Sequence, residues 1–166
     1  MKPVILLSAI LLLVGCDQSS NRSEASEQRE SKTKPTLEDV SLADLKGNPI
    51  KISDYKGQVV FLNFWATWCK PCIAEMPSID RAKKALEGKE VVFLAASDES
   101  IEKIERFMGK YEFSFDFIQM KDDFATLAIH SLPTTIIYDR SGKIILNEVG
   151  ARDWDTTEMI EKLTSL

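Results

Sequence analysis

Two cysteines separated by two residues are the part of the chain best suited to do chemistry. Cys69 and Cys72 enclose Lys70 and Pro71, where an apolar run from Val59 to Trp65 gives way to a periodic segment. A Cys-x-x-Cys pair at a strand-to-helix junction is typical of a dithiol that opens and closes a disulfide. A purely structural disulfide would close so small a ring that it contributes only about 2 kcal/mol. The spacing therefore predicts a redox-active pair.

The expected place of the pair at the start of a helix explains how one thiol would be activated. If Cys69 is the N-cap, unpaired backbone N–H groups and the helix dipole stabilise its thiolate. Pro71 suits the first turn because its fixed φ and missing N–H cost nothing there. We expect Lys70 to be exposed and to tune the redox potential through its charge. Cys72 would return beside Cys69 and resolve a mixed disulfide.

Composition limits the other kinds of chemistry. The chain has 166 residues and a formal net charge of −5, which leaves room for one globular domain and gives no basic patch for nucleic acid. His130 is the only histidine, and two cysteines with one histidine lack the fourth ligand of a structural zinc site. We therefore expect a monomer with no cofactor, no metal and no nucleic-acid partner.

The first residues have the pattern of an export signal. Lys2 precedes an apolar run of eleven residues from Val4 to Val14, which is too short for a membrane span of about twenty residues. The ending Leu-Val-Gly-Cys resembles the lipobox of bacterial lipoproteins, which implies that residues 1–16 are a signal peptide and that Cys16 carries a lipid. An ordinary signal with an incidental cysteine is the alternative. Asp17 resembles a signal for retention in the inner membrane. Residues 17–35 are polar and read as a flexible tether.

Hydrophobic patterns after the tether predict an alternation of strands and helices. An N-terminal β-hairpin is expected over 37–52, and the last helix is expected to follow Asp153 as its N-cap. The first helix follows the cysteines and should kink at Pro77, and the second is expected to begin at Asp98 or Ser100. The remaining expected elements are strands over 59–65, 91–96, 113–120, 132–138 and 143–146 and a short helix over 123–129. This order indicates a mixed sheet flanked by helices.

Three motifs at these spacings resemble the thioredoxin superfamily. They are the stretch from Gly57 to Cys72, the triplet Glu75-Met76-Pro77, and Leu132-Pro133-Thr134-Thr135. The resemblance covers residues 36–166 and is strongest to the membrane-tethered TlpA/ResA/CcmG-like thiol-disulfide oxidoreductases. It implies an α/β thioredoxin-like fold, with a mixed central β-sheet flanked by helices and an N-terminal β-hairpin.

The resemblance also implies roles for residues around the dithiol. Pro133 corresponds to the cis-proline that faces the cysteines, Leu132 would offer backbone groups to an extended client, and Trp68 would form the rim of the site. Asn63 stands where thioredoxin has a buried aspartate, and an amide cannot take a proton. Glu75 is then the candidate acid or base, with a solvated helix glutamate as the alternative.

These inferences predict an extracytoplasmic, lipid-anchored enzyme, which would face the periplasm from the inner membrane in an organism with two membranes. It would exchange thiols and disulfides with exported proteins and receive electrons from a membrane donor of the DsbD/CcdA type. Family resemblance favours a reductant, for example in cytochrome c maturation, and leaves a thiol oxidase or isomerase and a copper metallochaperone as alternatives. A peroxiredoxin is excluded because Ala66 and Leu62 stand where its Thr and Pro would precede Cys69.

Overall fold

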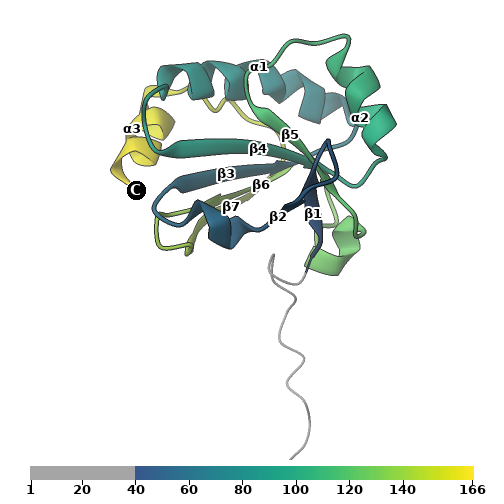
Figure 1. Ribbon diagram of the computed structural model, residues 1–166. Helices are drawn as coiled ribbons and strands as arrows, with labels where there is room; N and C mark the ends of the chain where they lie inside the picture. The colour runs from purple at the N-terminus through teal and green to yellow at the C-terminus, as the bar shows by residue number, and fades with distance from the viewer. Residues whose placement is uncertain (1–39) are drawn as a thin grey trace, which may run out of the picture. The chain divides into compact units, whose positions relative to one another are not determined.

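The central feature of the fold is one seven-stranded sheet, seen in a computed structural model that describes residues 40–166 (Figure 1). The strands are β1 (Leu42–Asp44), β2 (Pro49–Ile50), β3 (Val59–Phe64), β4 (Val91–Ser97), β5 (Asp116–Met120), β6 (Thr134–Tyr138) and β7 (Ile144–Val149). The helices are α1 (Lys70–Ala85), α2 (Ile101–Met108) and α3 (Thr157–Ser165), with short 3₁₀ turns η2 (Ile52–Tyr55) and η3 (Phe124–Leu127).

The strand order places β3 near the middle of the sheet. The order is β2-β1-β5-β4-β3-β6-β7; β3, β4 and β5 are parallel, and the other neighbours are antiparallel. All six residues of β3 are buried, as the nearly continuous apolar run predicted for a strand covered on both faces. This confirms the predicted mixed sheet flanked by helices.

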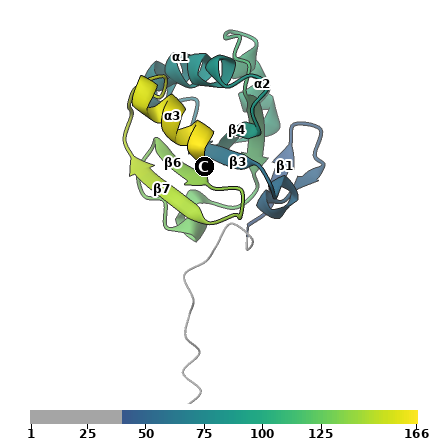
Figure 2. The same cartoon turned by 90° about the vertical axis from the view of Figure 1, so that its left-hand side faces the viewer.

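The two faces of the sheet are covered differently. α1, α2 and α3 pack on one face through buried residues such as Met76, Ile104 and Leu163, and Figure 2 shows these helices on the same side. The opposite face is covered by η2, η3 and the segment before β1, through Ile52, Phe124 and neighbouring residues. Alternate residues of β3 therefore point into two separate apolar clusters, with Phe61 in the first and Leu62 in the second.

Several predicted elements are confirmed with changed bounds. The N-terminal hairpin is present as the antiparallel pair β1 and β2, which is shorter than the predicted range. α2 follows Ser100, one of its two predicted caps, and α1 continues through Pro77 to Ala85. The kink at Pro77 stays a prediction.

No helix among residues 40–166 has the length and hydrophobicity that crossing a membrane requires. The predicted signal peptide, the tether and Cys16 lie outside the described residues.

Two predicted bounds are wrong for identifiable reasons. The predicted cap of the last helix was Asp153, but α3 begins after Thr156, whose hydroxyl accepts a hydrogen bond from Met159 N. The predicted strand from residue 113 begins only at Asp116, because the chain before it is held by α1. The Ser114 backbone N–H and hydroxyl both donate to Asp80, and Lys83 donates to the Ser114 carbonyl.

Candidate active site

The dithiol lies where β3 passes into α1, and in this structure it is closed as a Cys69–Cys72 disulfide. Cys69 is the N-cap of α1 and its sulfur accepts a hydrogen bond from Cys72 N at 3.3 Å. Pro71 occupies the first turn, and Lys70 is exposed, as predicted. Because a backbone N–H points at the Cys69 sulfur from the positive end of a helix, the reduced Cys69 is favoured as a thiolate.

The two cysteines differ in access. Cys72 is fully buried, whereas Cys69 retains a small exposed fraction and follows Trp68, whose exposed fraction is 71%. Trp65, by contrast, is buried in the core against Phe107 and Phe117. Of the two sulfurs, Cys69 is therefore the one that an approaching molecule can reach.

A carboxylate that sequence reasoning missed holds the loop in front of Cys69. Glu99, just after β4, accepts hydrogen bonds from Thr67 N at 2.6 Å and from the Thr67 hydroxyl at 2.9 Å. Lys103 lies 3.5 Å from the same carboxylate. One feature of the sequence could have identified Glu99. It is an acidic residue two positions after a buried strand parallel to β3, and the carboxyl ends of parallel strands lie at one edge of the sheet.

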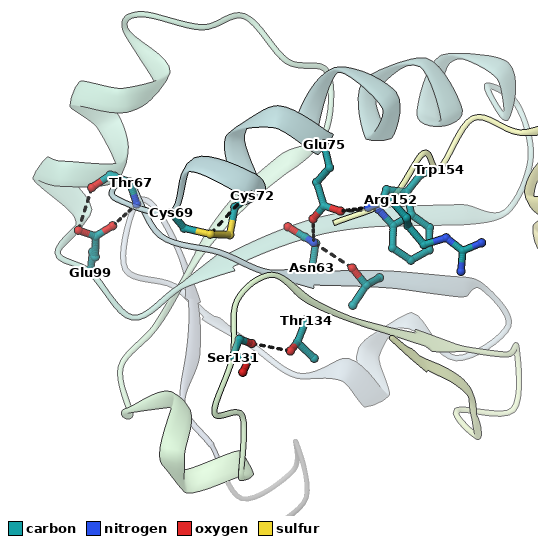
Figure 3. Close-up of a disulfide and its surroundings, with 11 residues drawn as sticks. Asn63, Thr67, Cys69, Cys72, Glu75, Glu99, Ser131, Thr134, Arg152 and Trp154 are labelled. Carbon is teal, nitrogen blue, oxygen red and sulfur yellow. Dashed lines mark hydrogen bonds between the residues drawn. A yellow bond between two sulfur atoms is a disulfide. The ribbon is translucent and has the colours of Figure 1, made fainter. Parts of the chain in front are cut away.

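The predicted cis-proline is confirmed. The Leu132–Pro133 peptide bond is cis, and Thr134, the next residue, pairs with Phe64 at the end of β3 that leads to the cysteines. The turn is closed by the Thr134 hydroxyl, which donates to the Ser131 carbonyl at 2.7 Å (Figure 3). Leu132 is half-buried and Pro133 buried, at the same end of the sheet as the dithiol.

Glu75 is buried within the first part of α1 and is not the solvated helix residue of the alternative interpretation. Its carboxylate accepts hydrogen bonds from Asn63 Nδ2 at 2.9 Å, Trp154 Nε1 at 2.9 Å and Arg152 N at 3.2 Å (Figure 3). Burial raises the pKa of Glu75 above its ordinary value, although the three hydrogen bonds act in the opposite direction. The Arg152 guanidinium does not neutralise it, because that group pairs with Glu148 and lies over the Trp154 ring.

Asn63 connects Glu75 to the sheet. Its exposed fraction is 1%, and its Nδ2 donates both to Glu75 and to the Thr135 hydroxyl at 2.9 Å. Within the part of the chain that the structure describes, Asn63 Oδ1 is buried without a hydrogen-bond partner. The sequence singled out Asn63 and Glu75, but it contained no signal for their contact or for the donors Arg152 and Trp154.

The residues described provide little for a metal. His130 is exposed, and no cluster of three or more His, Cys, Asp or Glu side chains suited to a metal ion occurs within residues 40–166. The groups that the structure brings together here are two sulfurs, one buried carboxyl group and one buried amide.

The raised pKa of Glu75 predicts how stability depends on pH. A carboxyl group whose folded-state pKa exceeds its unfolded value stabilises the fold at pH values below the unfolded pKa, and this contribution is lost as pH rises through the folded pKa. We therefore expect the free energy of unfolding of the wild type, relative to Glu75→Gln, to fall as pH is raised from below 4.5, the ordinary pKa of a glutamate, to neutrality. Urea unfolding of the oxidised proteins at several pH values measures this.

Glu158→Gln, which removes one exposed carboxylate from α3, is the matched control for the loss of charge. If the difference between wild type and Glu75→Gln does not change with pH, the raised pKa is contradicted.

Comparisons with known proteins agree with this geometry. The model of the AhpC/TSA family matches residues 34–147. The thiol-disulfide oxidoreductase ResA of Geobacillus thermodenitrificans is 33% identical over 147 residues, which cover 87% of this chain and 83% of the relative.

Two solved structures are similar over most of the chain. A putative thiol:disulfide interchange protein DsbE from Chlorobium tepidum has a TM-score of 0.67 at 25% identity, covering 80% of this chain and 96% of that chain. The exposed lipoprotein thioredoxin of Streptococcus pneumoniae has a TM-score of 0.59 at 26% identity, covering 76% of this chain and 98% of that chain. Together with the disulfide at the start of α1, these similarities show that the chain belongs to the AhpC/TSA family and is a thiol-disulfide oxidoreductase of the ResA-like group.

Proposed function

We propose that the protein reduces disulfides in exported protein clients through Cys69 and Cys72. The Cys69 thiolate attacks one sulfur of a client disulfide, forming a mixed disulfide while the second client sulfur leaves as a thiolate. Cys72 then loses its proton and attacks the Cys69 sulfur, which closes the Cys69–Cys72 disulfide and releases the first client sulfur. Two electrons pass from the dithiol to the client, and the two client thiolates take up two protons.

The observation that carries this proposal is the asymmetry of the two sulfurs. Cys69 has a helix N-terminus and a backbone N–H to stabilise its charge, and it lies beside the exposed Trp68, whereas Cys72 is fully buried. Attack by the accessible sulfur and resolution by the buried one follow from this arrangement. Trp68, Leu132 and Pro133 would contact the client, with the backbone of Leu132 pairing to an extended segment. Lys70 and Pro71 would tune the couple.

Glu75 would act on the second step. Its buried carboxylate lies one helical turn beyond Cys72, and burial raises its pKa above the ordinary value, which makes it a better proton acceptor than an exposed glutamate. We propose that it accepts the Cys72 proton as the mixed disulfide is resolved. A negative carboxylate close to Cys72 would also raise the pKa of that thiol by like-charge repulsion.

Glu75→Gln tests this role. We expect slower release of client from the mixed disulfide, by about a hundredfold or more if a general base is lost, and a changed pH profile of the Cys72 reaction. Rapid-mixing measurements from pH 6 to pH 9 with a disulfide-bonded peptide separate this step from the attack by Cys69. Rates that are unchanged across this range would contradict the proposal.

The direction of electron flow is tested by the midpoint potential of the Cys69/Cys72 couple. Related proteins span from about −270 mV for thioredoxin to about −120 mV for a strong oxidant. We expect a value below about −250 mV, measured by equilibration with glutathione or dithiothreitol buffers. A value above about −150 mV would identify an oxidant instead.

We further propose that the enzyme works on the outer side of the membrane. Residues 1–16 would be removed as a signal peptide, Cys16 would carry the lipid, 17–35 would be the tether, and 36–166 the catalytic domain. The similarity to the exposed lipoprotein thioredoxin of Streptococcus pneumoniae supports this arrangement. A DsbD/CcdA-type donor would then re-reduce a monomeric, inner-membrane enzyme from within the bilayer.

Cys16→Ser should move the protein from the membrane to the soluble fraction, and unchanged fractionation would contradict lipid anchoring.

A further inference from the structure

The buried oxygen of Asn63 has no hydrogen-bond partner among residues 40–166 of the oxidised protein. Its amide orientation is set by the opposite atom, because Nδ2 donates to the Glu75 carboxylate, which when ionised can only accept. A second acceptor, the Thr135 hydroxyl, holds the same nitrogen. Oδ1 is consequently directed to the other side of the amide, the side on which Figure 3 shows Cys72. Leaving a buried acceptor empty is unfavourable, so a group that fills it in another state of the enzyme is favoured.

We propose that Asn63 Oδ1 accepts a hydrogen bond from the Cys72 thiol when the disulfide is reduced. In the Cys69–Cys72 disulfide neither sulfur bears a hydrogen, so the acceptor has nothing to bind. Reduction by two electrons breaks the S–S bond, and one of the protons taken up resides on Cys72. That proton supplies the missing donor. The inference deepens the proposed function, because it concerns the same dithiol.

This hydrogen bond would shift the redox equilibrium. It exists only in the reduced enzyme, so it favours the dithiol over the disulfide by about threefold to tenfold in the equilibrium constant. It also favours the thiol form of Cys72 over the thiolate, which keeps the resolving sulfur protonated until a mixed disulfide forms. Asn63 would thus make the enzyme a weaker reductant than the same site with an apolar residue.

The same amide would link Cys72 to Glu75. With Glu75 ionised, Nδ2 donates to the carboxylate and Oδ1 is available for the Cys72 thiol. If the proton has moved to Glu75, a half-turn of the amide lets Oδ1 accept from the carboxylic acid while Nδ2 donates to the Cys72 thiolate. Each of the two proton arrangements is therefore matched by one orientation of Asn63, and the total number of protons is unchanged.

Infrared spectroscopy of the S–H stretch tests the hydrogen bond directly. In a full-length Cys16→Ser, Cys69→Ser background, Cys72 is the only thiol of a chain with three cysteines. We expect the S–H frequency of Cys72 to rise when Asn63→Ala is added, because a donated hydrogen bond lowers that frequency. Asn63→Asp, which keeps an acceptor oxygen, should retain the low frequency. Thr135→Val, which removes only the contact to Nδ2, is the matched control and should also retain it.

The redox equilibrium provides a second readout. In the protein with both active-site cysteines, Asn63→Ala should shift the thiol-disulfide equilibrium toward the disulfide by about threefold to tenfold, and Thr135→Val should not. An S–H frequency that is the same with Asn63 and with alanine would overturn the inference. That result would leave the proposed function intact, because client reduction by the wild type is measured separately.

A second, independent observation concerns the surface beside the dithiol. A pocket of about 320 Å³ opens between the start of α1 and α2, and its walls include Thr67 and Ile73, which flank the motif on either side. The α2 side of the pocket carries three cations, Lys103, Arg106 and Lys110, and two aromatic rings, Phe107 and Tyr111. Lys103 is near Glu99 and Arg106 interacts electrostatically with Glu102 of α2, but among residues 40–166 neither Arg106 nor Lys110 forms a close ion pair, and both are exposed.

From this charge we infer that the pocket receives an acidic segment adjacent to the client's reacting cysteine. The whole chain has a net charge of −5, so a cationic wall next to the reactive sulfur is a local exception that an acidic client would recognise. An exposed arginine and lysine attract such a segment during the approach and hold it beside Cys69. The inference rests on the proposed function, since it assumes a protein client.

A pair of disulfide-bonded peptides that differ only in carrying glutamates or lysines beside the cysteine tests this surface. At low ionic strength, Arg106→Glu combined with Lys110→Glu should slow reduction of the glutamate peptide about tenfold and should not slow the lysine peptide. Added salt should shrink the difference. The matched control is Lys89→Glu with Lys143→Glu, two exposed cations at the opposite end of β3, with the same change in net charge.

Equal slowing of the two peptides, or the same effect from the control pair, would overturn the inference. The proposed function would fail differently, by the absence of reduction of either peptide by the wild type.

Discussion

The structure depends most on how it buries one carboxylate beneath the active-site helix. Glu75 receives three N–H donors, one from β3 and two from the segment that follows β7, so three parts of the chain meet at a single group. A carboxylate removed from water without such donors would either disrupt the fold or remain protonated. Ser78 strengthens the junction, since its hydroxyl donates to the Glu75 carbonyl and accepts from Trp154 N. The same contacts that hold the segment before α3 therefore place an ionisable group near the dithiol.

Strand direction explains why the other parts of the site converge. β3 and β4 are parallel, so the ends that carry the cysteine loop and Glu99 lie at one edge of the sheet. β6 is antiparallel to β3, so its beginning, with cis-Pro133, lies at that edge as well. Three loops from one central strand and its two neighbours thus surround the disulfide. The mixed sheet is a requirement of the site, because an all-parallel arrangement would put the residues before β6 at the far end.

The sequence predicted the parts of this arrangement that depend on local chemistry. A continuous apolar run identified β3, the Cys-x-x-Cys spacing identified the start of α1, and the resemblance around Leu132 identified the cis peptide bond. Contacts between distant segments were not predictable from one sequence. Trp154 directly follows the predicted cap of the last helix, and nothing local indicated that its indole N–H would bind a carboxylate 79 positions earlier. Asp153 failed as a helix cap for the same reason, because Trp154 and Arg152 hold that segment against α1.

The described domain has only two cysteines. This number limits how any mixed disulfide that the domain forms can be resolved. Within residues 40–166 the chain has no cysteine other than Cys69 and Cys72, and both are joined in the oxidised state. Within this domain, a mixed disulfide on Cys69 can therefore be resolved only by Cys72. A third thiol in this domain would allow disulfides other than Cys69–Cys72 to form. Within residues 40–166, the Cys69–Cys72 disulfide is therefore the single intramolecular disulfide that the domain can form.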